Sequence, residues 1–366
     1  MYLFFYYFRK VLILVVLVIP MNPRVGIAVA VLLALLLGAV SLVLIKSSEQ
    51  PAGERIVTDM AGKEIKIPAK LERVVTLNSE ALEMFYLFGE AEKVVGVGSW
   101  SKLDPILPKI MKLENLPDVG TASNPNVEAI VSLKPDLVIT YYAAGRYGYE
   151  TPKEIVDKLE QAGIPVFGII LAVTKPADFN QYYEMVDNFG KLLGKEKRAK
   201  EINDYLRGIR DRVVRETSKI PEENRIKVVY SWGDMTRIAG NATTMHAFIQ
   251  LAGGINIGGE LPQPYPTVDA EFIVSKNPNV WVCWHSKTRK YSVSDILKDP
   301  RFQSVSAVRD NRVYEEPELG SNWHPVRAHL FLLWHAKTYY PSLPLDFQKI
   351  ANEVCQRFYG IPLPSG

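Results

Sequence analysis

The sequence has few of the residues and motifs on which enzyme and metal-site chemistry usually depends. It contains two cysteines and five histidines, and no H-x-H or H-x₃-H pair that would give zinc or manganese closely spaced ligands. The phosphate-binding pattern G-x-x-x-x-G-K-[ST] and the metalloprotease pattern H-E-x-x-H are both missing. GVGSW at 96–100 lacks the final glycine of a nucleophile elbow. These absences argue against an enzyme and against a protein that binds a bare metal ion.

Charge and cysteine content narrow the possible classes further. The chain carries 43 Lys and Arg against 40 Asp and Glu, and its basic residues are scattered rather than gathered in a block. Nucleic acid is therefore not an expected partner, because its binding needs a concentrated basic surface. Cys283 and Cys355 are not a closely spaced metal-binding pair, and the sequence leaves both a free and a bridged state open. Cys283 lies in an apolar run, which favours a small buried hydrophobe there.

The amino-terminal part is strongly apolar. Residues 25–45 carry no charge and only Ser41 as a conventional polar side chain. At about 1.5 Å per residue, a helix of this length crosses a hydrocarbon layer of roughly 30 Å. Arg24 precedes the run and Lys46 follows it, and the bias of positive charge toward the cytoplasm places residues 1–24 inside the cell. We therefore expect a single-pass anchor in the cell membrane with an extracytoplasmic folded part.

Two points about this segment stay open at the level of sequence. The run is longer than an ordinary signal-peptide core and lacks an A-x-A-like site in its last turn, so an uncleaved anchor is favoured over a cleaved signal. Residues 2–19 form a second apolar run, which Arg9 and Lys10 interrupt; either it is another segment or the natural start is Met21. Residues 46–54 are polar and are expected to form a linker.

The stretch from Asp118 to Thr140 has the clearest pattern of a helix followed by a strand, and the rest of the chain is interpreted from it. Asn126 starts a predicted helix, Pro135 stops it, and residues 137–140 form a short run rich in β-branched residues, typical of a strand buried in a parallel sheet. Ligands of open parallel sheets bind beyond the carboxyl ends of the strands, so the residues that follow this strand are the first site candidates. They are Tyr141, Tyr142 and Arg146. The predicted apolar stripe of the helix consists of Val127, Ile130, Val131 and Leu133.

The same alternation of strands and helices runs through the rest of the chain. Residues 55–68 are predicted to form a small hairpin, and Thr151 is expected to cap a helix that ends at Gly163. We expect a first lobe over 55–194 and a second over 218–366, each with a mostly parallel sheet covered by helices. The expected strands are 73–77, 94–98, 137–140, 166–170, 227–231, 279–284 and 312–315. The expected helices outside the central stretch are 80–88, 152–162, 178–193, 243–252, 293–297, 324–340 and 347–359.

Residues 195–217, which follow Gly194, form the longest helical pattern. Apolar residues recur there at intervals of three and four and make one stripe on an otherwise charged helix about 35 Å long. Such a helix is either an ordinary surface helix or a bridge between two lobes. The expected fold class is therefore α/β, with two Rossmann-like lobes, a single long joining helix and a ligand cleft between the lobes. The stripe consists of Ala199, Ile202, Leu206, Ile209 and Val213.

Tryptophans gather where predicted strands end. Three of them follow strands and Trp323 precedes a helix, whereas Trp281 and Trp334 have the pattern of core residues. Cationic side chains lie beside them in the sequence, so the predicted cleft is aromatic and basic. Such a surface suits a planar or hydrophobic ligand that bears negative charge. The candidate cleft residues are Trp100, Tyr141, Tyr142, Arg146, Trp232, Trp284, His285, Lys287, Arg289, Trp323, His324 and Arg327.

Some polar candidates have a second interpretation. Arg146 either contacts the ligand or is solvated on its loop. His324 and Arg327 lie three residues apart at the start of a predicted helix, where they would hold an anion. Alternatively, His324 only caps this helix or packs in the interior. His329 and His335 are interpreted as structural. Asn241-Ala242-Thr243 is a glycosylation sequon, whose use depends on the host.

Five motifs in order resemble a known family. They are RVVTL at 73–77, the central stretch with its L-K-P-D-L-V-I, LAGGIN at 251–256, NPNV at 277–280 and DNRVY at 310–314. Their order is similar to that in the substrate-binding proteins that feed ferric-siderophore, haem and cobalamin ABC importers. The resemblance covers residues 54–360.

The resemblance implies an extracytoplasmic binding protein that captures an iron chelate, a corrinoid or haem and delivers it to an ABC permease dimer with its ATPase. No catalytic residue or resident cofactor is implied, and the interlobe helix is expected to be rigid. Met245 and His246 are placed beside the ligand, with His246 as a direct contact or an axial metal ligand. Glu128 and Glu271 match the carboxylates that dock to permease arginines, although their places near helix starts also suit residues that complement the helix dipole.

The sequence departs from the family's pattern in two places. No cysteine lies near residue 46 to carry a lipid, and SNWHPVRAHLF at 321–331 is unusual. A protein that binds bare metal and a chelatase-like enzyme of similar two-lobed plan are the alternatives. A membrane-anchored sensor is a third, disfavoured because residues 1–24 leave no room for an output domain.

Overall fold

A first parallel sheet forms from short runs of buried, largely β-branched residues. The computed structural model describes residues 53–141, 150–169, 178–285 and 289–364. In this sheet β4 (Val94–Val97), β3 (Val74–Thr76), β7 (Leu137–Tyr141) and β8 (Val166–Ile169) lie in that order, and each neighbouring pair is parallel. The first four residues of β7 are all buried, as the apolar run at 137–140 predicts. Residue Tyr141 is therefore carried to the carboxyl edge of the sheet.

A hairpin precedes this sheet at the predicted place. It consists of β1 (Glu54–Thr58) and β2 (Glu64–Pro68), which pair with each other. Ile65 and Ile67 are buried and alternate with exposed residues, as a strand with one buried face requires. The Asp59 carboxylate accepts hydrogen bonds from the backbone of its own turn and from the Gly168 amide in β8, so it fixes the hairpin against the sheet.

A second parallel sheet has the same number of strands. Its order is β10 (Ile255–Asn256), β9 (Lys227–Ser231), β11 (Val280–Cys283) and β12 (Val313–Glu315). The sequence predicts β9, β11 and β12 but not β10, because two residues are too few to show a pattern. Two parallel sheets with covering helices confirm the α/β class. A further pair, β5 (Gly120–Thr121) and β6 (Asn124–Pro125), is antiparallel.

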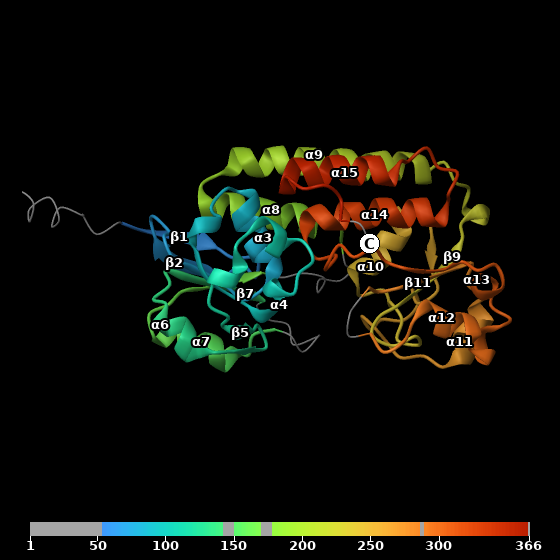
Figure 1. Ribbon diagram of the computed structural model, residues 1–366, viewed down its shortest axis with the longest axis horizontal. Helices are drawn as coiled ribbons and strands as arrows, with labels where there is room; N and C mark the ends of the chain where they lie inside the picture. Colours follow the sequence, from blue (N-terminus) through green and yellow to red (C-terminus); the bar gives the residue numbers. More distant parts are fainter. Residues whose placement is uncertain (1–52, 142–149, 170–177, 286–288, 365–366) are drawn as a thin grey trace, which may run out of the picture. The chain divides into compact units, whose positions relative to one another are not determined.

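Most of the described helices follow strands of one of the two sheets, and four others lie outside this alternation (Figure 1). Those that follow strands of the first sheet are α3 (Ser79–Leu87), α4 (Ser99–Lys102), α5 (Leu107–Ile110), α6 (Val127–Ser132) and α7 (Lys153–Gln161). Those of the second are α10 (Thr244–Leu251), α11 (Ala270–Lys276), α12 (Val293–Lys298) and α13 (Ser306–Arg309). The remaining four are α8 (Gln181–Leu193), α9 (Glu196–Thr217), α14 (Pro325–Tyr339) and α15 (Phe347–Tyr359). Single 3₁₀ turns lie at η1 (Ala91–Lys93), η2 (Leu113–Asn115), η3 (Glu222–Asn224) and η4 (Pro300–Phe302).

Among the described residues, four helices rather than one make up the layer that joins the two sheets: α8, α9, α14 and α15. The predicted apolar stripe of α9 is buried, and α9 packs against α8 and α14. Figure 1 shows α15 beside them, and the Tyr205 and Phe358 rings meet between α9 and α15 at 5.3 Å. At the amino-terminal end of α14, Arg327 donates a hydrogen bond to a carboxylate of α3. At the carboxyl-terminal end of α14, the Tyr339 carbonyl accepts a hydrogen bond from Arg312, which lies beside β12. The expectation of a single joining helix is therefore incomplete.

Two local predictions are wrong. Thr151 does not cap α7, because Pro152 occupies the cap position and the Thr151 hydroxyl bonds to Thr140 and to the Ala122 carbonyl instead. Val131 is 39% exposed and does not join the buried face of α6, whose buried residue is Ile130. Adjacent residues of a helix point about 100° apart, so Ile130 and Val131 do not share one face.

Several predictions fall outside the described residues. These are the membrane segment at 25–45, most of the linker at 46–54, and the site candidates Tyr142, Arg146 and Lys287. In the part of the chain that the structure describes, no helix is both long and apolar enough to cross a membrane.

Candidate functional site

An aromatic group lies at the carboxyl edge of the second sheet. Trp232 follows β9 and Trp284 follows β11, and because these strands are neighbours the two indoles meet with ring centroids 5.4 Å apart. Trp232 also stacks on Tyr265 at 4.9 Å, and the Arg237 guanidinium lies 4.4 Å from the centre of the Trp232 ring. We call Trp232, Tyr265, Trp284 and Arg237 the aromatic group. All four are half-buried, which leaves part of each side chain accessible.

The sequence predicts only half of this group. Trp232 and Trp284 are identified by their places after strands. Arg237 and Tyr265 come from irregular segments, where no periodic pattern marks them. The Arg237 side chain also donates from Nε to the Tyr265 carbonyl, so the cation and the second ring are fixed to each other.

The cationic candidates beside this group are bonded to protein acceptors. His285 Nδ1 lies 2.7 Å from Glu315 Oε1, and the Arg289 guanidinium pairs with the same carboxylate. Arg289 also donates to the carbonyls of Trp284 and Tyr291. These bonds neutralise positive charge that was predicted to face a ligand.

Tyr141, at the carboxyl end of β7 in the first sheet, contacts Trp323. Their rings meet edge to face at 5.6 Å, although Trp323 lies far along the sequence, just before α14. The Tyr141 hydroxyl donates to Glu80 Oε2 at 2.5 Å. Trp100 lies in α4 and is 58% exposed, next to the similarly exposed Leu103. No pattern in the sequence indicates that Glu80, a buried carboxylate, lies next to Tyr141.

His324 and Arg327 occupy a different environment from the one predicted. Both side chains are fully buried. Arg327 bonds to Glu83 at 2.9 Å and to Asp104 at 2.5 Å, while His324 lies 3.1 Å from Glu83 and 3.8 Å from Glu80. The prediction that these residues hold a ligand anion is corrected, since carboxylates of the first lobe already surround them. We call Glu80, Glu83, Asp104, His324 and Arg327 the buried ionic cluster.

In the buried ionic cluster, charge pairing determines the direction of the pKa shifts of Glu83, Asp104 and Arg327 against the effect of burial. Burial alone would raise the pKa of Glu83, but the interactions with His324 and Arg327 lower it below its ordinary value. The pKa of Asp104 is likewise lowered by Arg327 and His324 against the effect of burial. Burial would lower the pKa of Arg327, yet Glu83 and Asp104 raise it well above its usual value. Both carboxylates and the guanidinium are therefore charged at neutral pH.

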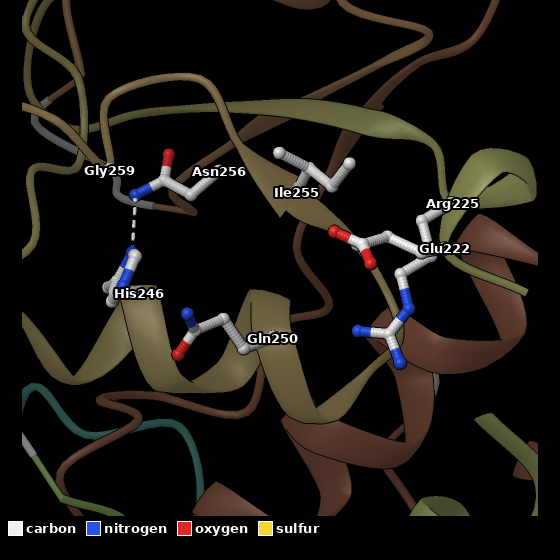
Figure 2. Close-up of a pocket in the computed structure, with 8 residues that line it drawn as sticks. Glu222, Arg225, His246, Gln250, Ile255, Asn256 and Gly259 are labelled. Carbon is white, nitrogen blue, oxygen red and sulfur yellow. Dashed lines mark hydrogen bonds between the residues drawn. The ribbon is translucent and has the colours of Figure 1, made fainter. Parts of the chain in front are cut away.

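His246 lines a cavity of about 610 Å³ and not the aromatic group. Figure 2 shows this cavity, with His246 and Gln250 from α10 on one side and Ile255 and Asn256 of β10 on the other. Ile255 and Asn256 pair with the first two residues of β9, whereas Trp232 follows the last. At about 3.3 Å per residue, roughly 15 Å separate the two ends of that strand. The structure therefore does not bring His246 together with the aromatic residues.

Two further candidates of this region are buried or engaged. Met245 has no exposed surface and belongs to the core, so its predicted contact with a ligand is corrected. The predicted glycosylation acceptor Asn241 is half-buried and donates from Nδ2 to the Gly259 carbonyl.

The two docking candidates occupy matching places. Glu128 is the second residue of α6 and Glu271 the second residue of α11, and both are exposed. Each helix is capped by the side chain before it: Asn126 accepts from the Ala129 amide and Asp269 from the Phe272 amide. The predicted equivalence of the two positions is therefore present in the structure, one for each sheet.

The remaining candidate ligands serve the interior. His329 accepts from the Tyr183 hydroxyl and donates to the Pro325 carbonyl, and His335 lies between Glu316 and Tyr339. Cys283 and Cys355 are free and buried, and burial raises the pKa of the Cys283 thiol to about 12 and that of Cys355 to about 11. Among the described residues, no three His, Cys, Asp or Glu side chains are arranged to hold a metal ion.

Known proteins resemble this chain along most of its length. MolA, a molybdate-binding protein of Haemophilus influenzae, is 24% identical over 333 residues, which cover 84% of this chain and 91% of MolA. A cobalamin-binding protein of Halobacterium salinarum is 31% identical over 260 residues, or 70% of this chain and 64% of that relative. The names of both describe solute binding, in agreement with the expectation of a transport protein rather than an enzyme.

A solved structure shows the same fold. MolA with molybdate bound, described as the cognate periplasmic binding protein of an ABC transporter, has a TM-score of 0.73 at 22% identity and covers 85% of this chain and 99% of its own. Residues 74–318 match the family described as periplasmic binding protein. With two parallel sheets, their joining helices and a match of this extent, the chain belongs to the periplasmic binding protein family.

Proposed function

We propose that the protein captures an organic metal chelate, of the iron-chelate, corrinoid or haem class, and delivers it to an ABC permease dimer driven by its ATPase. The aromatic group carries this proposal. Three rings at the carboxyl edge of the second sheet offer a face on which a planar or macrocyclic ligand stacks, and Arg237 supplies a cation beside it. Tyr141, at the end of β7, and Trp323, just before α14, supply further aromatic surface. The cobalamin-binding relative supports the same ligand class.

A bare oxyanion is the second candidate ligand, and the molybdate-binding relative favours it. An oxyanion is held by several hydrogen-bond donors and positive charges rather than by ring faces. At the aromatic group itself, Arg289 is already bonded to a carboxylate and Arg237 covers a ring. This arrangement favours the organic chelate over the oxyanion.

Tryptophan fluorescence tests the ligand class. The protein is titrated in parallel with a ferric-siderophore mimic, haem, cobalamin, molybdate and free divalent metals. We expect saturable quenching by one chelate, which weakens in Trp232→Ala and in Trp284→Ala but persists in Trp334→Phe, because Trp334 lies in α14 and is not part of the aromatic group. Quenching by molybdate alone that is unchanged in both alanine variants would contradict the proposal.

Docking to the permease is tested by charge reversal. Glu128→Arg together with Glu271→Arg is expected to abolish uptake in cells and to leave the affinity for ligand unchanged, because both side chains are exposed. The matched control is Glu154→Arg with Glu196→Arg, two glutamates that also lie in first helical turns. Loss of uptake in the control pair as well would show a general charge effect, and full uptake in the first pair would refute the docking roles.

The proposal includes an anchor at residues 25–45, outside the described residues. An uncleaved anchor predicts that the cellular protein keeps its amino terminus and stays with the membrane after extraction at alkaline pH. The intact mass of the protein purified from membranes distinguishes this from a cleaved signal. Release in soluble form with a shortened amino terminus would replace the anchor by a signal peptide.

A further inference from the structure

The cavity in Figure 2 contains an arginine whose hydrogen-bonding capacity is unused. Arg225 lies just after η3, and within the described part of the chain its side chain has no hydrogen bond or ion pair. Its Nε atom is buried and has no acceptor. Glu222, which also lines the cavity, is exposed and forms no ion pair with Arg225 in the described structure. A guanidinium that is partly desolvated and unpaired gains from any acceptor that enters the cavity.

The orientation of Asn256 fixes the hydrogen-bonding role of His246. Asn256 Oδ1 accepts from the Gly258 amide and Nδ2 donates to the Ala239 carbonyl, so backbone groups set which end of the amide is which. The same Nδ2 faces His246 Nδ1 at 3.2 Å, and Nδ1 must therefore be the acceptor. Burial lowers the pKa of His246, which favours the neutral ring. In that ring the proton lies on Nε2, so His246 offers a donor.

This tautomer argues against an axial metal ligand. Coordination through Nε2 requires the ring proton on Nδ1, where it would point at the donating amide of Asn256. The side-chain amide of Asn256 cannot rotate by 180° without losing its two hydrogen bonds to backbone groups. The predicted axial contact of His246 with a metal thus conflicts with its surroundings.

We propose that this cavity is a second binding site, separate from the aromatic group, for a small anion with carboxylate or other oxyanion oxygens. The Arg225 guanidinium provides a charged donor at one end of the cavity, and the His246 Nε2–H and the Gln250 amide provide donors at the other (Figure 2). A volume of about 610 Å³ is typical of small-molecule sites, and its polar lining suits a polar occupant. The site lies at the amino end of β9, so its occupant does not compete with a ligand on the aromatic group.

The proposal is tested by nuclear magnetic resonance of the full chain labelled with ¹⁵N in glycine and histidine. The probes are acetate, inorganic phosphate and chloride. We expect saturable shifts of the Gly254 and Gly259 amides and of the His246 ring with acetate or phosphate but not with chloride, and the ring nitrogens should report a proton on Nε2. Acetate and phosphate as separate arms identify which oxyanion is preferred.

Variants make the test decisive. Arg225→Gln is expected to weaken binding about tenfold or more, because a charge-assisted bond is lost. Lys298→Gln, an exposed residue of the same lobe outside the cavity, is the matched control and should leave affinity unchanged. Glu222→Gln should tighten binding by removing a like charge. No saturable shift, equal affinity in Arg225→Gln, or loss of binding in Glu222→Gln would each overturn the proposal, the last by indicating a ligand with a positive group.

Discussion

Arg327 shows how strongly one buried charge ties distant parts of the chain together. It comes from α14, whereas its partners Glu83 and Asp104 come from the first lobe, more than two hundred positions earlier in the sequence. Removal of one member leaves the others buried without compensation, which costs more than the pair itself contributes.

The first prediction concerns this residue. Arg327→Met should lower the free energy of unfolding by about 3–5 kcal/mol, because Glu83 and Asp104 lose their counterion in a buried place. Urea denaturation measures the change. The control is Lys200→Met, which breaks an exposed pair with Asp204 and should cost about 0.5 kcal/mol or less. Equal effects of the two substitutions would show that the cluster is no more important than a surface pair.

His329 makes stability depend on pH. Burial lowers its pKa from 6.5 to about 3 in the folded protein. Between these values the unfolded chain binds a proton that the folded chain does not, so the free energy of unfolding falls as pH falls, by about 1.4 kcal/mol per pH unit at most. The window from pH 6.5 to 4.5 separates this effect from those of Glu83 and Asp104, whose lowered pKa values act only at or below their ordinary values of 4.5 and 3.8. His246, whose pKa is also lowered by burial, contributes in the same window.

The second prediction follows from that sign. His329→Gln should reduce the slope of unfolding free energy against pH between pH 6.5 and 4.5, whatever its effect on stability at neutral pH. Denaturant titrations at several pH values give the slope. His246→Gln is the comparison, and it should change the slope less because His246 is only half-buried. An unchanged slope in His329→Gln would mean that His329 is protonated in the folded protein.

At the residue scale, the sequence shows which side chains follow strands but not what surrounds them. Tyr141, Trp232 and Trp284 could be placed because strand ends are readable from local pattern. The acidic surroundings of His324 and Arg327 could not, because Glu80, Glu83 and Asp104 are brought to them by tertiary packing alone.

At the scale of single elements, the turn between α8 and α9 depends on one glycine. Gly194 adopts φ 65°, the left-handed conformation that ends α8, and a side chain there would meet no other atom. Gly208, in the middle of α9, is also in open space but has helical backbone. Substitution of either glycine by alanine therefore causes no steric clash, and the difference between the two variants measures the conformational cost of a left-handed alanine.

The third prediction uses this pair. Gly194→Ala should destabilise the protein by about 1 kcal/mol, whereas Gly208→Ala should stabilise it by roughly 0.5–1 kcal/mol. Thermal or urea unfolding of the two variants measures both signs. A stabilising Gly194→Ala would show that α8 and α9 do not need the left-handed turn.

Element boundaries were predictable where the pattern was long enough. Residues 347–359 and the apolar stripe of α9 show clear helical periodicity, and both helices form as predicted. Helices α4, α5 and α13, each a single turn, and the two-residue strand β10 carry no periodicity and were missed. Their conformation is set by the elements on which they pack rather than by their own sequence.

For the molecule as a whole, the joining layer restricts relative motion of the two sheets. Because α14 is bonded to α3 at one end and to the region of β12 at the other, any movement of the sheets must bend α14 or break the buried ionic cluster. This is stiffer than a connection by extended strands.

The fourth prediction concerns this stiffness. Spin labels attached at Glu114→Cys and Lys298→Cys, exposed positions of the two lobes, should give nearly the same distance distribution with and without ligand. Pulsed electron paramagnetic resonance measures this distance distribution. Cys283 and Cys355 are buried and should not react with the spin label. A second pair with Arg327→Met added should show a broader distribution. A large ligand-dependent shift in the parent pair would contradict a rigid connection.

The two neighbouring indoles of the aromatic group have an optical consequence. The two ring centroids lie 5.4 Å apart and the ring planes are inclined by 37°. At this separation the transition dipoles of the indoles couple with each other, so Trp232 and Trp284 should give a paired band in the circular dichroism spectrum. A molecule that stacks on or between these rings changes their coupling, and the band therefore reports occupancy of this face without any added dye.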